Sequence, residues 1–148
     1  MQLRYYEDYQ VGENIGADTY LVDKDEMVEF ALKWDPQPFH VDEKAAKASI
    51  YGGLTAPSVY TMAIASYLGS HIDPPIAALG ALGFTDLEFP NPVRPGDRIT
   101  LISTVTQKRS SETKPDRGII HYSVALTNQD NEPVYTYKIK ILVAKETK

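Results

Sequence analysis

The sequence predicts a single α+β domain in which a curled antiparallel sheet surrounds one central helix. The chain has 148 residues, the size of one ordinary domain, so residues 1–148 are interpreted as one unit. Helical patterns lie before residue 69, and four strand-like segments follow one another after it. Residues 58–68 carry no charged side chain, which is typical of a helix buried against a sheet.

One strand and one capped helix are predicted before Pro36. Residues Asn14–Val22 alternate loosely and include β-branched and aromatic side chains, which favours a strand. Asp23 followed by Glu26 predicts a helix start of the capping-box type, and Pro36 ends this helix because the residue before a proline is kept out of helical geometry. The apolar stripe of the helix is expected to comprise Val28, Ala31 and Leu32.

Two further helices are expected between residues 42 and 69. Asp42 precedes a short helical stretch over Glu43–Ala48 and is its expected cap. Ser58–Leu68 is the longest helical candidate, and Gly69 is expected to stop it. One side of that helix is expected to hold Val59, Met62, Ala63 and Ser66.

Four strands are predicted in the second half of the chain. They cover Ala77–Phe89, Arg98–Lys108, Gly118–Thr127 and Val134–Val143. The segments between them are rich in turn residues: Pro90–Asp97, Ser110–Arg117 and Asn128–Pro133. Pro95-Gly96 fits a type II turn, since glycine supplies the positive φ that this turn requires. Because the loops are short, consecutive strands are expected to pair antiparallel.

The composition excludes several classes of protein. The formal net charge is −5, whereas a nucleic-acid-binding module usually presents a basic face. The sequence contains no cysteine, which rules out disulfide frameworks, thiolate zinc sites and cysteine nucleophiles. Residues 1–10 do not resemble a signal or transit peptide, and no apolar run is long enough for a membrane span. A cytoplasmic protein with no membrane partner is therefore expected.

The candidate chemistry lies in WDPQPFHVDEKAA, residues 34–46. Pro36 and Pro38 prevent one continuous helix, so the segment is expected to be a stiff loop that directs Asp35 and His40 into one cavity. The apolar neighbours Trp34 and Phe39 would exclude water from that cavity. The residues alone leave a second interpretation open, in which Asp-Pro starts an ordinary turn and the histidine is a structural hydrogen-bonding residue.

This segment closely resembles the hydratase signature of the MaoC-like dehydratase family, which includes the (R)-specific enoyl-CoA hydratases. The spacing between Asp35 and His40 matches the family pattern, Pro38 matches its proline, and Gln37 replaces its asparagine. A second run, Glu88–Ile99 (EFPNPVRPGDRI), resembles the turn that leads into a strand in hot-dog proteins generally. The first motif is the more specific of the two.

The resemblance implies a hot-dog fold with the Ser58–Leu68 helix at its centre, and a hydratase or dehydratase acting on trans-2-enoyl thioesters. It implies that Asp35 deprotonates the water and that His40 holds the same water and helps to return a proton to the α-carbon. No metal or redox cofactor is expected, and the acyl group of the substrate is expected to be attached to coenzyme A or to an acyl carrier protein. The family also pairs two sheets edge to edge, so a homodimer or a dimer-based oligomer is expected.

The remaining site residues also follow from the resemblance. The family stabilises the thioester oxygen with a backbone N–H near the start of the central helix, and here Pro57 cannot donate, so the amide of Ser58 is the candidate. The candidate substrate-binding residues are Gln37, Phe39, Tyr51, Tyr60 and Thr61.

Two other functions remain open at this stage, a hot-dog thioesterase and a non-catalytic acyl-CoA-binding subunit. The departure from the family pattern at Ser58 is the main support for the second. A locally basic region is a candidate contact for the phosphates of coenzyme A, with solvent-exposed side chains as the alternative interpretation. It comprises Arg94, Arg98, Lys108, Arg109, Lys114 and Arg117.

Overall fold

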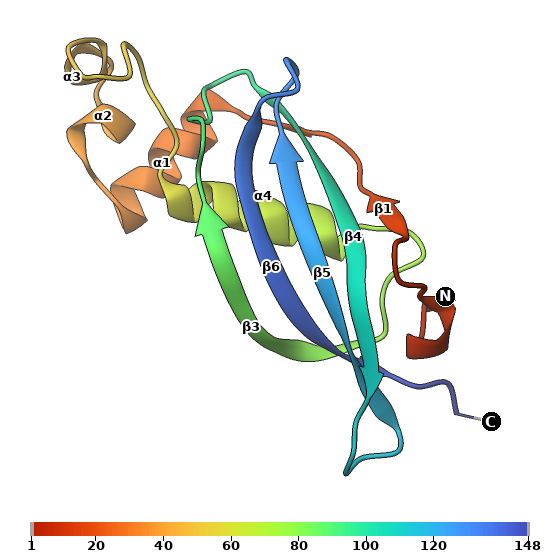
Figure 1. Ribbon diagram of the computed structural model, residues 1–148. Coiled ribbons are helices and arrows are strands. Elements are labelled where there is room, and N and C mark those ends of the chain that lie inside the picture. The colour runs from red at the N-terminus through yellow and green to blue at the C-terminus, as the bar shows by residue number, and fades with distance from the viewer. Residues whose placement is uncertain (1, 148) are drawn as a thin grey trace.

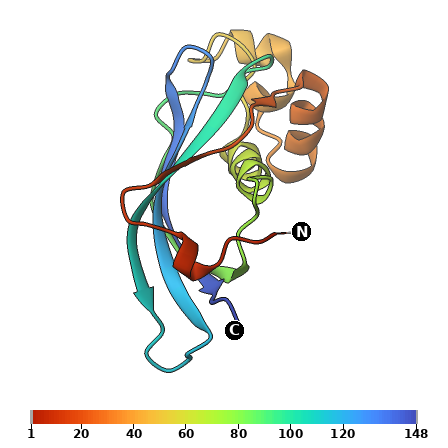
Figure 2. The ribbon, with the colours of Figure 1, turned by 90° about the vertical axis from the view of Figure 1, so that its right-hand side faces the viewer.

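A six-stranded antiparallel sheet forms one layer of the protein, and the α-helices lie on one side of it (Figures 1 and 2). The computed structural model describes residues 2–147. The strands are β1 (Asn14–Gly16), β2 (Tyr20–Leu21), β3 (Ala78–Glu88), β4 (Arg98–Ser110), β5 (Arg117–Thr127) and β6 (Pro133–Ala144). Their order is β1-β4-β5-β6-β3, and β2 pairs with another stretch of β4.

The α-helices are α1 (Lys24–Trp34), α2 (Pro38–Val41), α3 (Glu43–Lys47) and α4 (Ser58–Ser70), and a 3-10 helix, η1, covers Tyr6–Asp8. Figure 2 shows the sheet bending around α4, and Figure 1 shows α1, α2 and α3 gathered near the N-terminal end of α4. No helix within residues 2–147 is both long enough and apolar enough to span a bilayer.

The core forms between α4 and the inner face of the sheet. On β5 the side chains alternate between buried and half-buried, as expected for a strand covered on one face. The α4 side chains that face the core are Tyr60, Thr61, Ile64, Ala65 and Leu68. The opposite side of α4 leaves Val59, Ala63 and Ser66 exposed, although it too carries no charge. The helix is therefore covered on one side only within a single chain.

Most of the predicted elements are confirmed, and the capping of α1 shows why. The Asp23 carboxylate accepts a hydrogen bond from the Glu26 N–H at 2.9 Å, and Asp42 caps α3 in the same manner. The predicted turn at Pro95-Gly96 is also confirmed, because Gly96 has φ +86° and the Asp97 N–H donates to the Arg94 carbonyl at 3.1 Å.

Two predicted boundaries and one predicted core residue are wrong. The expected strand over residues 14–22 is two short strands, β1 and β2, which pair with separate stretches of β4. The helix α4 continues through Gly69 to Ser70, since glycine weakens a helix without necessarily ending it. Leu32, expected in the apolar stripe of α1, is 61% exposed; Ala31 is buried as expected, and Met27 is buried in addition.

The expected pairing of consecutive strands is confirmed for β4, β5 and β6 but is wrong for β3. Strand β3 pairs with β6 rather than with β4, its neighbour in sequence. The connection Pro90–Asp97 contains three prolines, which lack the N–H needed to continue a hairpin ladder, and it crosses to the other edge of the sheet. As a result β3 is an edge strand that is paired on one side only.

The turn at Gly96 provides a test of the fold. Replacing Gly96 by Ala forces a side chain into a left-handed conformation, so the free energy of unfolding is expected to fall by about 1 kcal/mol. Gly16→Ala is the matched control, because Gly16 lies in β1 without a positive φ and has open space around it. Urea denaturation followed by circular dichroism measures both variants, and an equal loss in the two would contradict the assignment.

Candidate active site

The C-terminal end of α1 positions Asp35. The Asp35 N–H donates to the Ala31 carbonyl at 2.8 Å and completes the last turn of the helix. Pro36 prevents the helix from continuing, and the Gln37 N–H then bonds to the Asp35 carbonyl at 2.9 Å. The chain therefore turns back immediately after Asp35, and the carboxylate is held at a fixed corner between α1 and α2.

His40 lies in the short helix α2, where the sequence predicts a loop. Pro38 occupies the start of this helix, a position at which the missing N–H costs nothing, so two prolines are compatible with one helical turn. The side chain of His40 is only 8% exposed, and its Nδ1 lies 2.7 Å from the carbonyl oxygen of Thr55. Because a carbonyl can only accept, Nδ1 carries the proton, and Nε2 is free to act as a base.

The structure brings the predicted catalytic pair together. The Nε2 atom of His40 lies 3.6 Å from the Oδ2 atom of Asp35. This distance is too long for a direct hydrogen bond and suits two groups that share a third partner such as a water molecule. The expectation that Trp34 covers this pair is wrong within one chain, because the Trp34 side chain is 63% exposed and that of Asp35 is 34% exposed.

Thr55 is a part of the site that sequence reasoning missed. Its side chain is buried, and its N–H donates to the Phe39 carbonyl at 3.4 Å while its carbonyl holds His40. These two bonds join α2 to the segment that leads into α4. A backbone carbonyl leaves no signal in the sequence, because every residue has one.

The predicted oxyanion donor, Ser58, is the first residue of α4 and is exposed. The first hydrogen bonds of this helix run from the N–H groups of Tyr60 and Thr61 to the Pro57 carbonyl. The amide of Ser58 therefore belongs to the first turn, where helical N–H groups have no partner within the helix and the helix dipole favours an anion.

The predicted substrate-binding residues occupy three different environments. Phe39 and Tyr51 are half-buried and lie together, with ring centroids 5.3 Å apart. Gln37 is exposed at the start of α2. Thr61 and Tyr60 are buried on the core side of α4. Phe39 and Tyr51 are thus the two that lie next to each other beside His40.

The hydroxyl of Tyr60 donates to the carboxylate of Glu26, 2.5 Å away, and the hydroxyl of Tyr20 donates to the same carboxylate oxygen. Burial and the bond to Glu26 both raise the pKa of Tyr60, and the same two causes raise that of Tyr20 to about 12. Glu26 was expected to complete a capping box; instead it ties α1 to α4, which carry Asp35 and Ser58 at their ends.

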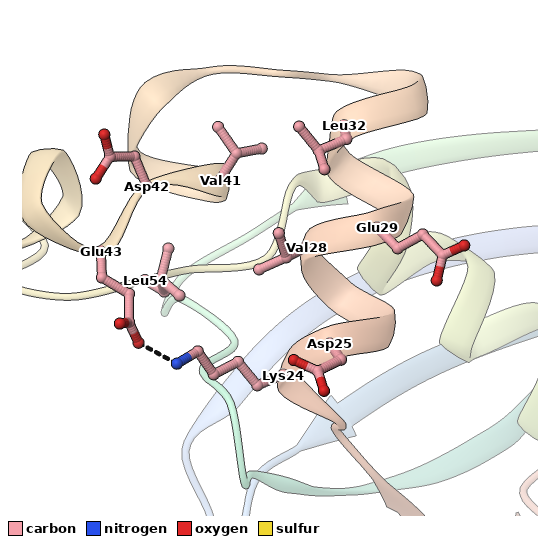
Figure 3. A pocket seen from close by; sticks show the side chains of 9 residues that line it. All are labelled: Lys24, Asp25, Val28, Glu29, Leu32, Val41, Asp42, Glu43 and Leu54. Atoms are coloured by element: carbon pink, nitrogen blue, oxygen red, sulfur yellow. Dashed lines mark ion pairs between the residues drawn. The ribbon is translucent and has the colours of Figure 1, made fainter.

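Two open cavities lie along α1, α3 and the loop that follows α3. The first has a volume of about 670 Å³ and is acidic, and Figure 3 shows its aliphatic floor and the Lys24–Glu43 ion pair at its edge. The second, of about 680 Å³, is basic. Asp35 and His40 line neither cavity. Within residues 2–147 no group of three or more His, Asp or Glu side chains is arranged to hold a metal ion.

Comparison with known proteins decides the family. A family model described as a MaoC like domain matches residues 8–127. The chain belongs to the MaoC-like domain family. The matched part of this MaoC-like chain includes Asp35, His40, Ser58 and the loop that contains Thr55.

Solved structures agree with the family assignment. A MaoC-like dehydratase from Rhodospirillum rubrum is 34% identical and has a TM-score of 0.88, over 98% of this chain and 99% of that chain. The R-hydratase PhaJ1 from Pseudomonas aeruginosa shares the fold with a TM-score of 0.79 at 22% identity, over 96% of this chain and 86% of that chain.

The fold is the predicted hot-dog fold. Rv0216 from Mycobacterium tuberculosis, which is described as having a double hotdogfold, gives a TM-score of 0.80 at 14% identity, over 97% of this chain and 45% of that chain. Among curated proteins, the uncharacterized protein YdeM from Bacillus subtilis (strain 168) is 27% identical over 143 residues, which are 94% of this chain and 98% of YdeM.

The link between α1 and α4 leads to a stability prediction. Tyr60→Phe removes a buried hydroxyl that donates to a carboxylate, so the free energy of unfolding is expected to fall by about 1–3 kcal/mol. Tyr67→Phe, on the exposed side of the same helix, is the control and is expected to change it by less than about 0.5 kcal/mol. Chemical denaturation measures both, and a Tyr60→Phe variant as stable as the control would show that the link contributes nothing.

Proposed function

We propose that this protein is an acyl-thioester hydratase or dehydratase that adds water to, or removes it from, a trans-2-enoyl thioester. The observation that supports the proposal most is the placement of Asp35 and His40, with Nε2 of His40 facing the carboxylate at 3.6 Å. Two bases at this separation can both contact one water molecule, which suits the activation of water. The similarity to a MaoC-like dehydratase at 34% identity supports the same class of reaction.

In the proposed hydration, Asp35 removes one proton from the water as the water oxygen bonds to C3 of the enoyl group. The double-bond electrons move toward the thioester carbonyl, and the amide of Ser58 stabilises the enolate oxygen that forms. Nε2 of His40 accepts a hydrogen bond from the same water and helps the proton taken up by Asp35 to return to C2, while Nδ1 keeps its bond to Thr55. The product gains one water in total, and both side chains return to their starting state.

The proposed substrate is an acyl thioester of coenzyme A or of an acyl carrier protein. Phe39 and Tyr51 form an apolar surface next to His40 that suits part of the acyl group or its arm. Gln37, Tyr60 and Thr61 remain proposals as substrate contacts, and the burial of Tyr60 and Thr61 favours a role in shaping the site from within α4. The proposal requires no metal or redox cofactor, since coenzyme A enters as part of the substrate.

Activity measurements test the catalytic pair. Asp35→Asn and His40→Ala are each expected to lower kcat for the hydration of crotonyl-CoA and longer enoyl-CoAs by about 10²–10⁴-fold, because each removes a group that moves a proton. The loss of the conjugated enoyl absorbance reports the reaction. Asp130→Asn and His71→Gln are matched controls on exposed parts of the chain and are expected to keep full activity.

Three outcomes distinguish the candidate functions. Loss of enoyl absorbance without release of thiol supports the hydratase. Release of free thiol, detected with a thiol-trapping dye, indicates a thioesterase and contradicts the proposal. Binding of acyl-CoA without any turnover, with no effect of His40→Ala, indicates a non-catalytic acyl-CoA-binding subunit.

We further propose that the protein acts as a homodimer formed along β3. This edge strand is exposed on both faces and carries Leu79, Leu82 and Phe84, whose side chains are 52%, 51% and 49% exposed. An unprotected apolar edge strand normally has a partner. The uncharged outer side of α4 and the open position of Asp35 and Trp34 also fit a site that a second subunit covers.

Changing the edge tests the dimer. Leu82→Glu is expected to shift the protein toward monomers in light scattering coupled to gel filtration, because it places a charge in the apolar contact. Ile102→Glu is the matched control, since Ile102 is exposed to a similar extent but lies on β4 inside the sheet. A wild-type monomer, or a dimer disrupted by Ile102→Glu and unaffected by Leu82→Glu, would show that the β3 edge is not the interface.

A further inference from the structure

We propose that the basic cavity between α3, the 51–55 loop and the β3–β4 connection binds the phosphate groups of coenzyme A. This inference deepens the proposed function, and it rests on that function for the thioester end of the ligand. The cavity has a volume of about 680 Å³ and is lined on one side by α3 and on the other by Arg94 and Pro95. Gly52, Gly53 and Leu54 line it between them.

Charge distinguishes this cavity from the rest of its neighbourhood. Residues 1–50 hold eleven acids and only five bases, yet three of these five bases line the cavity. They are Lys24, Lys44 and Lys47, and Arg94 joins them from a distant part of the chain. Glu43 is the one acidic residue in the lining, and it forms an ion pair with Lys24. The lining thus has a net charge of +3 in a protein whose net charge is −5.

The surplus charge is available for a ligand. No ion pair found among residues 2–147 involves Lys44, Lys47 or Arg94. Arg94 is nevertheless held in place, because its Nη2 donates to the Tyr51 carbonyl at 2.7 Å and leaves other guanidinium donors unused by that bond. A positioned guanidinium beside two flexible ammonium groups is a typical arrangement for binding phosphate.

The neighbouring cavity has the opposite charge. It shares Lys24, Glu43 and Leu54 with the basic cavity, but its other charged residues, Asp25, Glu29 and Asp42, are all acidic. In Figure 3, Asp25 and Glu29 extend from α1, and Asp42 lies next to Glu43 at the start of α3, across the cavity from α1. An anionic ligand is therefore repelled from the acidic cavity and attracted to the basic one, which favours one position for its phosphates.

The cavity also has a suitable connection to the catalytic pair. Gly52, Gly53 and Leu54 line the cavity, and the next residue, Thr55, accepts the hydrogen bond from His40. Tyr51, at the other end of the same loop, packs on Phe39 and receives the bond from Arg94. The 51–55 loop therefore contacts both the basic cavity and the residues around His40. Coenzyme A has its phosphates and its thioester at opposite ends of a long uncharged pantetheine arm, so it needs two such separate places.

The six basic residues that the sequence analysis grouped together are not the ones that line the basic cavity. Of the six, only Arg94 lines the cavity. Lys108 instead donates to the carbonyls of Tyr6 and Tyr9, and Arg117 pairs with Asp116. The concave shape of the cavity favours the small phosphates of coenzyme A over the broad acidic surface of a carrier protein.

The test compares substrates that do or do not carry phosphate. The double variant Lys44→Glu/Lys47→Glu is expected to raise KM for crotonyl-CoA about tenfold or more, with kcat unchanged, and to leave KM for crotonyl-pantetheine as in the wild type. Added sodium chloride is expected to raise KM of the wild type for crotonyl-CoA only. Lys114→Glu is the control, because it makes one such charge reversal on the exposed β4–β5 loop, outside the lining of the cavity.

Several results would overturn the inference. They are an equal rise of KM for both substrates, an effect of Lys114→Glu as large as that of the double variant, or a double variant impaired only with a crotonyl-carrier protein. Calorimetry with coenzyme A alone separates this inference from the proposed function. If coenzyme A binds the wild type and binds Lys44→Gln/Lys47→Gln at least about tenfold more weakly, the phosphate site is supported even where no enoyl thioester is turned over. If the wild type turns over enoyl thioesters normally and Lys44→Gln/Lys47→Gln binds coenzyme A as tightly as the wild type, the phosphate site is overturned and the proposed function is not.

Discussion

The imidazole of His40 is fixed by one buried hydrogen bond, from Nδ1 to the carbonyl oxygen of Thr55, and the rest of the proposed site depends on it. The bond determines the tautomer, so Nε2 faces Asp35 with its lone pair. It also joins α2 to the segment that leads into α4, and Ser58 follows Thr55 in that segment by three residues. The bond from the Thr55 N–H to the Phe39 carbonyl supports the same connection.

In the part of the chain from α1 to α4, acidic and basic side chains lie around different cavities. The carboxylates of α1 and of Asp42 gather around one cavity, and the lysines of α3 gather with Arg94 around the other. The Lys24–Glu43 ion pair stands at the boundary between them. This separation explains how a chain with a net charge of −5 can present a locally positive surface next to a site proposed to act on thioesters of an anionic carrier.

The sequence predicted those parts of the fold and of the candidate site that depend on the side chain of a residue and on its near neighbours in the chain. The Asp35–His40 spacing, the caps at Asp23 and Asp42, and the turn at Gly96 all depend on local chemistry. Thr55 could not be predicted, because it acts through its backbone. Nor could the Glu26–Tyr60 bond, which joins residues 34 positions apart and replaces half of an expected capping box.

By itself, the sequence determined the α+β class and the order of most elements, because these follow from periodicity, caps and short-range spacing, and its Asp35–His40 segment carries the resemblance to the family. Only the tertiary structure decided that β3 crosses to the far edge beside β6, leaving an exposed apolar strand. It also decided that Lys44, Lys47 and Arg94 meet at one cavity. The reason is the same in both cases: strand order and charge clustering depend on which distant segments pack together, and local residue patterns carry no information about that choice.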